Sequence, residues 1–93
     1  MHTKQDKIRY LFELLAKIDD PDRLEDLFDD LCTVNELLSL SQRFEVARML
    51  QDKKTYLEIA EKTGASTATI SRVNRSLNYG TDGYELVFKR MEE

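Results

Sequence analysis

The segment from Gly64 to Leu77, GASTATISRVNRSL, carries side chains suited to contact with nucleic acid. Short hydroxyl and methyl side chains stand there beside two arginines, Arg72 and Arg75. Hydroxyls can hydrogen-bond to either donors or acceptors on base edges, methyl groups can contact the thymine methyl, and guanidinium groups bind phosphate or guanine. Because serine and threonine are weak helix formers, their density in a helix needs a reason other than stability. The segment therefore indicates a helix whose outward face matters.

This predicted helix, residues 66–77, has two different faces at about 100° per residue. Ile70, Val73 and Leu77 fall on one side and should anchor the helix in a core. The opposite side carries small residues near the N-terminal end and basic residues further along: Thr67, Ala68, Ser71, Arg72 and Arg75. A helix with a small-residue N-terminal end can enter a major groove, because larger side chains would hold it away from the bases.

A second short helix is predicted directly before the first. Thr55 and Glu58 have the spacing of a capping box, and Gly64 provides a left-handed C-terminal cap nine residues after Thr55. Ala60 is small enough for a close approach between the two helices, and Ile59 supplies a core anchor. The spacing predicts a helix-turn-helix over about residues 55–78.

The charge distribution supports a polyanionic partner. The net charge of the whole chain is −4, which taken alone argues against nucleic acid. Residues 1–30 carry five basic and nine acidic side chains, whereas residues 42–78 carry seven basic and four acidic ones. Lys53 and Lys54 precede the predicted helix-turn-helix, where contact with phosphate is expected. The basic half of the chain therefore coincides with the candidate reading helix.

The remaining elements also have helical periodicity, and no strand is predicted. Apolar residues recur at helical spacing over about residues 4–18, and Pro21 suits the start of the next helix. A capping box at Thr33 and Glu36 opens a long helix, and a last helix spans residues 84–91. The sequence predicts an all-α fold of six helices in a single domain, residues 1–93.

Composition argues against several other functions. Cys32 is the single cysteine and His2 the single histidine, so metal centres and nucleophilic catalysis have few suitable residues. We expect neither an enzyme nor a bound metal. No apolar run reaches the roughly 18 residues of a membrane span, and the first residues lack a signal-peptide pattern, so a cytoplasmic protein is expected.

Three segments resemble the tryptophan repressor family, and more closely its shorter relatives of unknown ligand. They are SQRFEVARML (41–50), YLEIAEKTGASTATISRVNRSL (56–77) and NYGTDGYELVFKRM (78–91). The resemblance implies a bacterial regulator with six helices that forms an intertwined homodimer and binds a two-fold DNA operator. It also implies that Thr67, Ala68 and Ser71 approach bases while Thr69 contacts phosphate.

The resemblance extends to a small-molecule pocket. Tryptophan-binding members hold the indole between two arginines, of which Arg72 matches the second. Arg43 matches the first if one gap is allowed, and Gln42 occupies that position without the gap. Ser76 also matches a pocket residue, but Val73 stands where the family has glycine and would fill space that the indole needs. Tryptophan is therefore not the expected ligand; another small-molecule co-repressor and no effector at all both stay open, and no cofactor is expected.

The sequence thus favours a dimeric, sequence-specific DNA-binding transcriptional regulator that acts as a repressor. One alternative is a protein-interaction module that docks partners on its acidic N-terminal helices and keeps the helix-turn-helix as a scaffold. Another is the DNA-targeting part of a larger recombinase-like enzyme, which is ranked last because six helices fill the chain and leave no catalytic domain.

Overall fold

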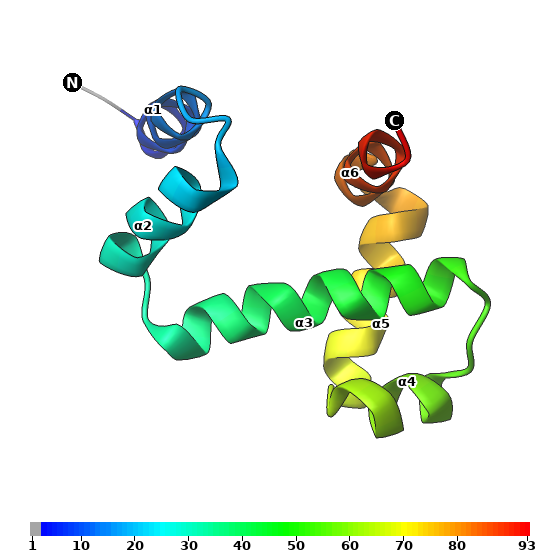
Figure 1. Ribbon diagram of the computed structural model, residues 1–93. Helices are drawn as coiled ribbons and strands as arrows, with labels where there is room; N and C mark the ends of the chain where they lie inside the picture. The colour runs from blue at the N-terminus through cyan, green and yellow to red at the C-terminus, as the bar shows by residue number, and fades with distance from the viewer. Residues whose placement is uncertain (1–2) are drawn as a thin grey trace. The chain divides into compact units, whose positions relative to one another are not determined.

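The computed structural model describes residues 3–93, and all regular structure in that range is α-helical. The prediction of six helices without strands is confirmed for these residues. The helices are α1 (Lys4–Leu15), α2 (Pro21–Leu31), α3 (Val34–Gln51), α4 (Tyr56–Thr63), α5 (Thr67–Tyr79) and α6 (Gly83–Met91) (Figure 1).

Side-chain caps fix where several helices begin. The Thr33 hydroxyl accepts a hydrogen bond from the Glu36 amide at 3.1 Å, and the Glu36 carboxylate accepts one from the Thr33 amide at 2.8 Å. Thr55 and Glu58 form the same reciprocal pair at the start of α4. The Ser66 hydroxyl caps α5 by accepting from the Thr69 amide. These bonds satisfy amides that have no partner inside a helix, as the capping patterns predict.

Two helix boundaries differ from the predicted ones by more than one residue. The first helix ends at Leu15 rather than at residue 18, and the Ile18 amide bonds to the Leu15 carbonyl in a tighter turn. Pro21 follows shortly, and the chain before a proline is driven towards extended backbone. At the other end, α5 continues two residues past Leu77, and Gly80 is its C-cap with extended backbone. A Cβ at this position would clash with the Ser76 carbonyl, so glycine is the residue that fits there.

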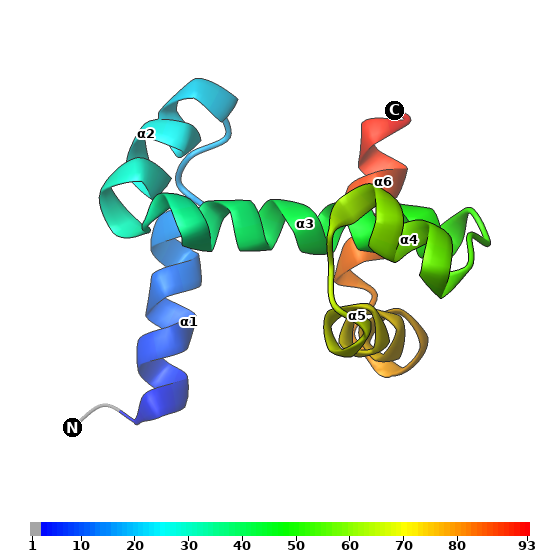
Figure 2. The same ribbon diagram turned by 90° about the horizontal axis from the view of Figure 1, so that it is seen from below.

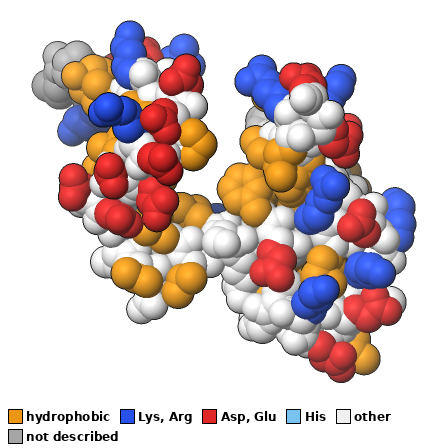
Figure 3. All heavy atoms as spheres, viewed as in Figure 1, with side chains coloured by type: hydrophobic (Ala, Val, Ile, Leu, Met, Phe, Trp, Pro, Cys, Tyr) orange, Lys and Arg blue, Asp and Glu red, His pale blue; other side chains and the backbone are white. Residues whose placement is uncertain are grey.

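The chain divides into two compact units, and the described part of the first is residues 3–37. Neither α1 nor α2 buries a residue completely. Large apolar side chains of this unit are more than two-fifths exposed, among them Ile8, Leu11, Phe12 and Leu31. Acidic side chains gather on the surface of this unit (Figure 3). The unit therefore leaves apolar surface open to water in the isolated chain.

The second unit, Leu38–Glu93, contains the fully buried residues of the described chain. Within it, α5 runs across α3, with α4 near the start of α5 and α6 beyond its end (Figures 1 and 2). The core consists of Val46, Ala47, Ile59, Ala65, Ile70, Val73 and Phe88. Leu77 and Ala60 are partly buried against it. The predicted anchors of the two short helices are therefore confirmed.

Within residues 3–93, none of the six helices combines the length and apolar character that a bilayer crossing requires.

Candidate nucleic-acid interface

The turn between α4 and α5 has the geometry that its sequence predicts. Gly64 adopts a left-handed conformation with φ of 74°, and its amide donates to the Ala60 carbonyl at 2.9 Å. This bond satisfies one of the last carbonyls of α4, and glycine adopts the conformation without steric cost. Ala65 is buried directly after the turn. The helix-turn-helix is therefore held by backbone geometry at Gly64 and by packing at Ala65.

The outward face of α5 is exposed as the helical map predicts. Thr67 and Ala68 in its first turn are exposed, as are Ser71, Arg72 and Arg75 further along. Thr69 differs from them, because it is half-buried and its hydroxyl lies 3.1 Å from the Ser66 hydroxyl, within hydrogen-bonding distance. The face thus presents methyl and hydroxyl groups first and guanidinium groups later.

The turn between α3 and α4 exposes two lysines. Lys53 adopts a left-handed conformation with φ of 64°, which is unfavourable for a residue with a side chain. The Lys53 amide donates to the Leu50 carbonyl and the Lys54 amide to the Met49 carbonyl, so the bend closes the end of α3. Both ammonium groups belong to exposed residues beside the helix-turn-helix.

The arginines of α5 are available to an outside anion. Among the described residues, ion pairs join Arg9 to Glu13, Arg23 to Asp20 and Arg48 to Glu92. None of these pairs involves a basic residue of α4 or α5. Since surface charges without a partner interact freely with polyanions, the basic side of the helix-turn-helix suits phosphate.

A small cavity of about 160 Å³ lies between α3, α5 and α6. Four of the five residues that the family resemblance assigns to an effector pocket line this cavity: Arg43, Arg72, Val73 and Ser76. The fifth, Gln42, does not line it, because its side-chain amide donates to the Thr63 carbonyl at 3.0 Å. Val73 is only 2% exposed and belongs to the core. The valine methyls therefore occupy space beside the two arginines.

Two residues of this region were missed by sequence reasoning. Tyr84 lines the small cavity from α6, and Thr63 receives the bond from Gln42 at the end of α4. The aromatic position of Tyr84 in the last helix was visible in the sequence, but which helix it would meet was not. Thr63 carried no signal beyond its place before Gly64.

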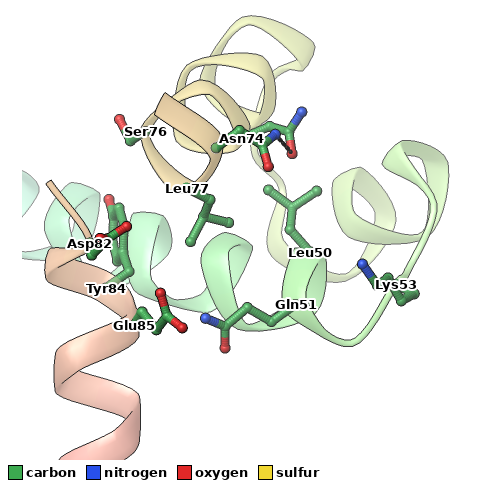
Figure 4. A pocket seen from close by; sticks show the side chains of 10 residues that line it. Leu50, Gln51, Lys53, Asn74, Ser76, Leu77, Asp82, Tyr84 and Glu85 are labelled. Atoms are coloured by element: carbon green, nitrogen blue, oxygen red, sulfur yellow. Dashed lines mark hydrogen bonds between the residues drawn. The ribbon is translucent and has the colours of Figure 1, made fainter. Parts of the chain in front are cut away.

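Two larger cavities adjoin the same helices. A polar cavity of about 260 Å³ is lined by side chains from the ends of α3 and α5 and the start of α6, including Gln51, Asn74, Asp82 and Glu85 (Figure 4). A mainly apolar cavity of about 540 Å³ is lined by Leu40, Phe44, Val87 and neighbouring residues. Residues 3–93 contain no group of three or more side chains placed to hold a metal ion.

The fold and this interface define a class of protein: a helix-turn-helix regulator that binds DNA. The chain belongs to the Trp repressor protein family, which it matches over residues 6–92. The resemblance noted in the sequence is thereby confirmed.

Three similar proteins place the chain within this family. The uncharacterized protein YerC of Bacillus subtilis strain 168 is 54% identical over 83 residues, which cover 89% of this chain and 80% of YerC. A Trp operon repressor homolog of Chlamydia caviae is 36% identical over 66 residues, covering 70% and 65% of the two chains. The crystal structure of a TrpR-like protein from Eubacterium eligens ATCC 27750 superimposes with a TM-score of 0.87 at 62% identity, covering 96% of this chain and 92% of the other.

Proposed function

We propose that the chain is a sequence-specific transcriptional repressor that occupies a two-fold operator as a homodimer. The observation that carries this proposal is the face of α5. Its small exposed side chains, Thr67, Ala68 and Ser71, stand on a helix fixed from behind by buried Ile70 and Val73. A rigid helix with a small outer face can bring hydroxyl and methyl groups to base edges in the major groove.

Base discrimination and affinity are assigned to different residues. Thr67, Ala68 and Ser71 approach bases, because they form the exposed small-residue end of α5. Arg72, Arg75 and the two turn lysines supply phosphate contacts, which carry affinity but no sequence information. Thr69 is assigned to phosphate by the family pattern, although its hydroxyl already lies within bonding distance of Ser66.

Homodimer formation is supported by the apolar surface of the isolated chain. Ile8, Phe12, Leu31 and Met91 are each more than half exposed, and α1 and α2 bury no residue. Because exposed apolar surface of this extent is costly in water, a second copy of the chain is the expected cover. Two copies related by a two-fold axis would present two α5 helices to half-sites one helical turn apart. We propose that residues 1–93 act as one domain within this dimer.

The residues that line the small cavity limit which effector could bind there. Arg43, Arg72 and Ser76 offer polar groups in the small cavity, while Val73 removes the room that an indole needs. We infer that tryptophan is not the effector. Either a smaller molecule binds there or the repressor needs none.

Selection of bound sites from random double-stranded DNA tests the proposal directly. A homodimeric reader should enrich a two-fold symmetric site, and sedimentation of the complex should show two chains per site. Binding should weaken steeply as salt rises, because each neutralised phosphate releases counterions. Absence of any enriched site at low salt would contradict the proposal and would favour a module that docks proteins on its acidic N-terminal helices, α1 and α2.

A further inference from the structure

The hydrogen bond from Gln42 to Thr63 differs in kind from the others made by side chains. Among the described residues, it is the one side-chain hydrogen bond that spans more than four positions in the sequence. It joins the middle of α3 to the last residue of α4 across 3.0 Å, and both residues are half-buried. A bond of this kind fixes one helix relative to another, whereas local caps fix a helix only relative to itself.

Thr63 is the centre of a connected set of bonds in the turn. Its hydroxyl donates to the Ile59 carbonyl at 2.7 Å and accepts from the Ala65 amide at 3.1 Å. Its carbonyl accepts from Gln42, which satisfies one of the carbonyls left open at the end of α4. Ser66, the next residue after Ala65, caps α5. A continuous path of hydrogen bonds and covalent bonds therefore leads from α3 through the turn to Ser66, the N-cap of α5.

The neighbouring residue on α3 points elsewhere. Successive residues of a helix are about 100° apart, so Arg43 cannot share the direction of Gln42. Arg43 lines the small cavity together with Arg72, while the Gln42 amide is engaged at the turn. Val73 fills the core between α3 and α5 with its methyl groups. The position of α5 is thus set by a hydrogen bond at one place and by apolar packing at another, both within the chain.

We propose that the Gln42–Thr63 hydrogen bond is an internal strut that holds the helix-turn-helix at its DNA-binding angle on α3, so that this chain binds its operator without an effector. Gln42 is a positioning residue, because it acts on DNA through the turn. The inference rests on the proposed function and adds to it the regulation of the reading helix.

The variant Gln42→Met and the matched control Gln51→Met test the strut. Gln42→Met keeps the length and most of the volume of the side chain but cannot donate. Gln51→Met makes the same change on the same helix at an exposed residue that faces the polar cavity. Affinities are measured for the selected site and for a scrambled duplex, with and without a pool of amino acids and nucleobases. Gln42→Met should weaken binding to the selected site about five- to tenfold, as for one lost hydrogen bond. Its binding to the scrambled duplex and that of Gln51→Met to both should match the unaltered chain.

A second test uses a second variant, Gln42→Glu, and the protonation state of its carboxyl. In Gln42→Glu, a protonated carboxyl can still donate to the Thr63 carbonyl, whereas an ionised one cannot. Affinity of this variant for the selected site should therefore fall as the pH rises through the pKa of the new carboxyl, relative to the unaltered chain at each pH. A merely structural loss in Gln42→Met would lower binding to both duplexes together and would overturn the inference. An effector pool that raises the affinity of the unaltered chain tenfold or more would also overturn it.

Hydrogen exchange in the free protein separates this inference from the proposed function. The Ala65 and Gly64 amides are bonded within the turn and should exchange slowly without any ligand. They should exchange faster in Gln42→Met but not in Gln51→Met. If the unaltered chain selected no DNA site, the proposed function would fail, and the role of the strut in DNA binding would fail with it. If DNA were selected but these amides and the selected-site affinity did not respond to Gln42→Met, only the strut would be overturned.

Discussion

The guanidinium carbon of Arg48 lies 5.2 Å from the centre of the Phe88 ring, which joins α3 to α6. The same guanidinium is 3.9 Å from the carboxylate of Glu92, the residue that directly follows α6. Phe88 is buried in the core, whereas the Arg48 side chain is about half exposed. The contact therefore places a cation over the edge of the core rather than within it.

Replacing Arg48 by methionine should lower the free energy of unfolding modestly. The methionine keeps the apolar stem but removes the exposed ion pair with Glu92 and the cation–π contact, of which the latter is worth about 0.5–1 kcal/mol at exposed sites. Urea unfolding at one fixed protein concentration measures the change, since the proposed dimer would make stability depend on concentration. A double-mutant cycle with Phe88→Leu should show coupling between the two residues. Additive effects would mean that the ring and the guanidinium do not interact.

Replacing Lys53 by glycine should raise stability and lower DNA affinity at once. Relief of the left-handed conformation should add about 0.5–1 kcal/mol to the free energy of unfolding. Loss of the ammonium should weaken binding to all DNA sequences and lower the salt slope by about 1. The measurements are chemical unfolding and a salt titration of DNA affinity. Lys54→Gly is the matched control, because φ of Lys54 is not positive and glycine there can only lose stability.

Local signals predicted the helix-turn-helix well because they act over a few residues. The Thr55–Glu58 box, the left-handed Gly64 and the Ser66 cap each depend on atoms within one turn of chain. The inward positions of Ile70 and Val73 follow from helical geometry alone, and both residues are buried. The sequence therefore sufficed to predict which face of α5 is buried and which is exposed.

Contacts between distant segments could not be predicted in the same way. Gln42 and Thr63 are 21 residues apart, and nothing in either residue type specifies the other as its partner. Likewise, the sequence left Gln42 and Arg43 as alternatives for one pocket position, and only the orientation of α3 separates them. The end of the first helix was predicted three residues too late because apolar periodicity continues to Ile18 while the hydrogen bonds of α1 tighten beforehand.

Arg75→Ala should weaken binding to all DNA sequences by a similar factor. The side chain is exposed and makes none of the ion pairs among the described residues, so stability should change by less than about 0.5 kcal/mol. Ser71→Ala is the informative contrast, because it removes a hydroxyl from the end of α5 proposed to approach bases and should change which site is preferred. Site selection with each variant measures both effects. A changed consensus with Arg75→Ala would mean that Arg75 reads a base.

Val73→Ala should destabilise the fold, and Val73→Gly should do so further. Removing two buried methyl groups costs about 1–3 kcal/mol, and glycine in a helix interior costs about 1 kcal/mol beyond alanine.

The unaltered chain should show no rise in melting temperature with added tryptophan, because Val73 fills the space beside Arg43 and Arg72. The melting temperature of Val73→Gly should rise with added tryptophan, since this substitution enlarges that cavity. A rise in the melting temperature of the unaltered chain with added tryptophan would contradict the inference that tryptophan is not the effector.

Glu36 should titrate below its ordinary range. The Thr33 amide, and after it the Thr33 hydroxyl, lower the pKa of the Glu36 carboxyl from 4.5 by hydrogen bonding to its ionised form. A carboxyl whose pKa is lower in the folded than in the unfolded chain stabilises the fold above its unfolded pKa. That contribution is lost as the pH falls through the folded-state pKa. Carbon-detected NMR titration of Glu36 measures the midpoint directly. Glu36→Gln keeps an acceptor for the Thr33 amide but cannot ionise, so its stability should depend less on pH between 3 and 5, taken as roughly the range over which a glutamate titrates. A Glu36 midpoint at or above 4.5 would show that the cap at the start of α3 opens in solution.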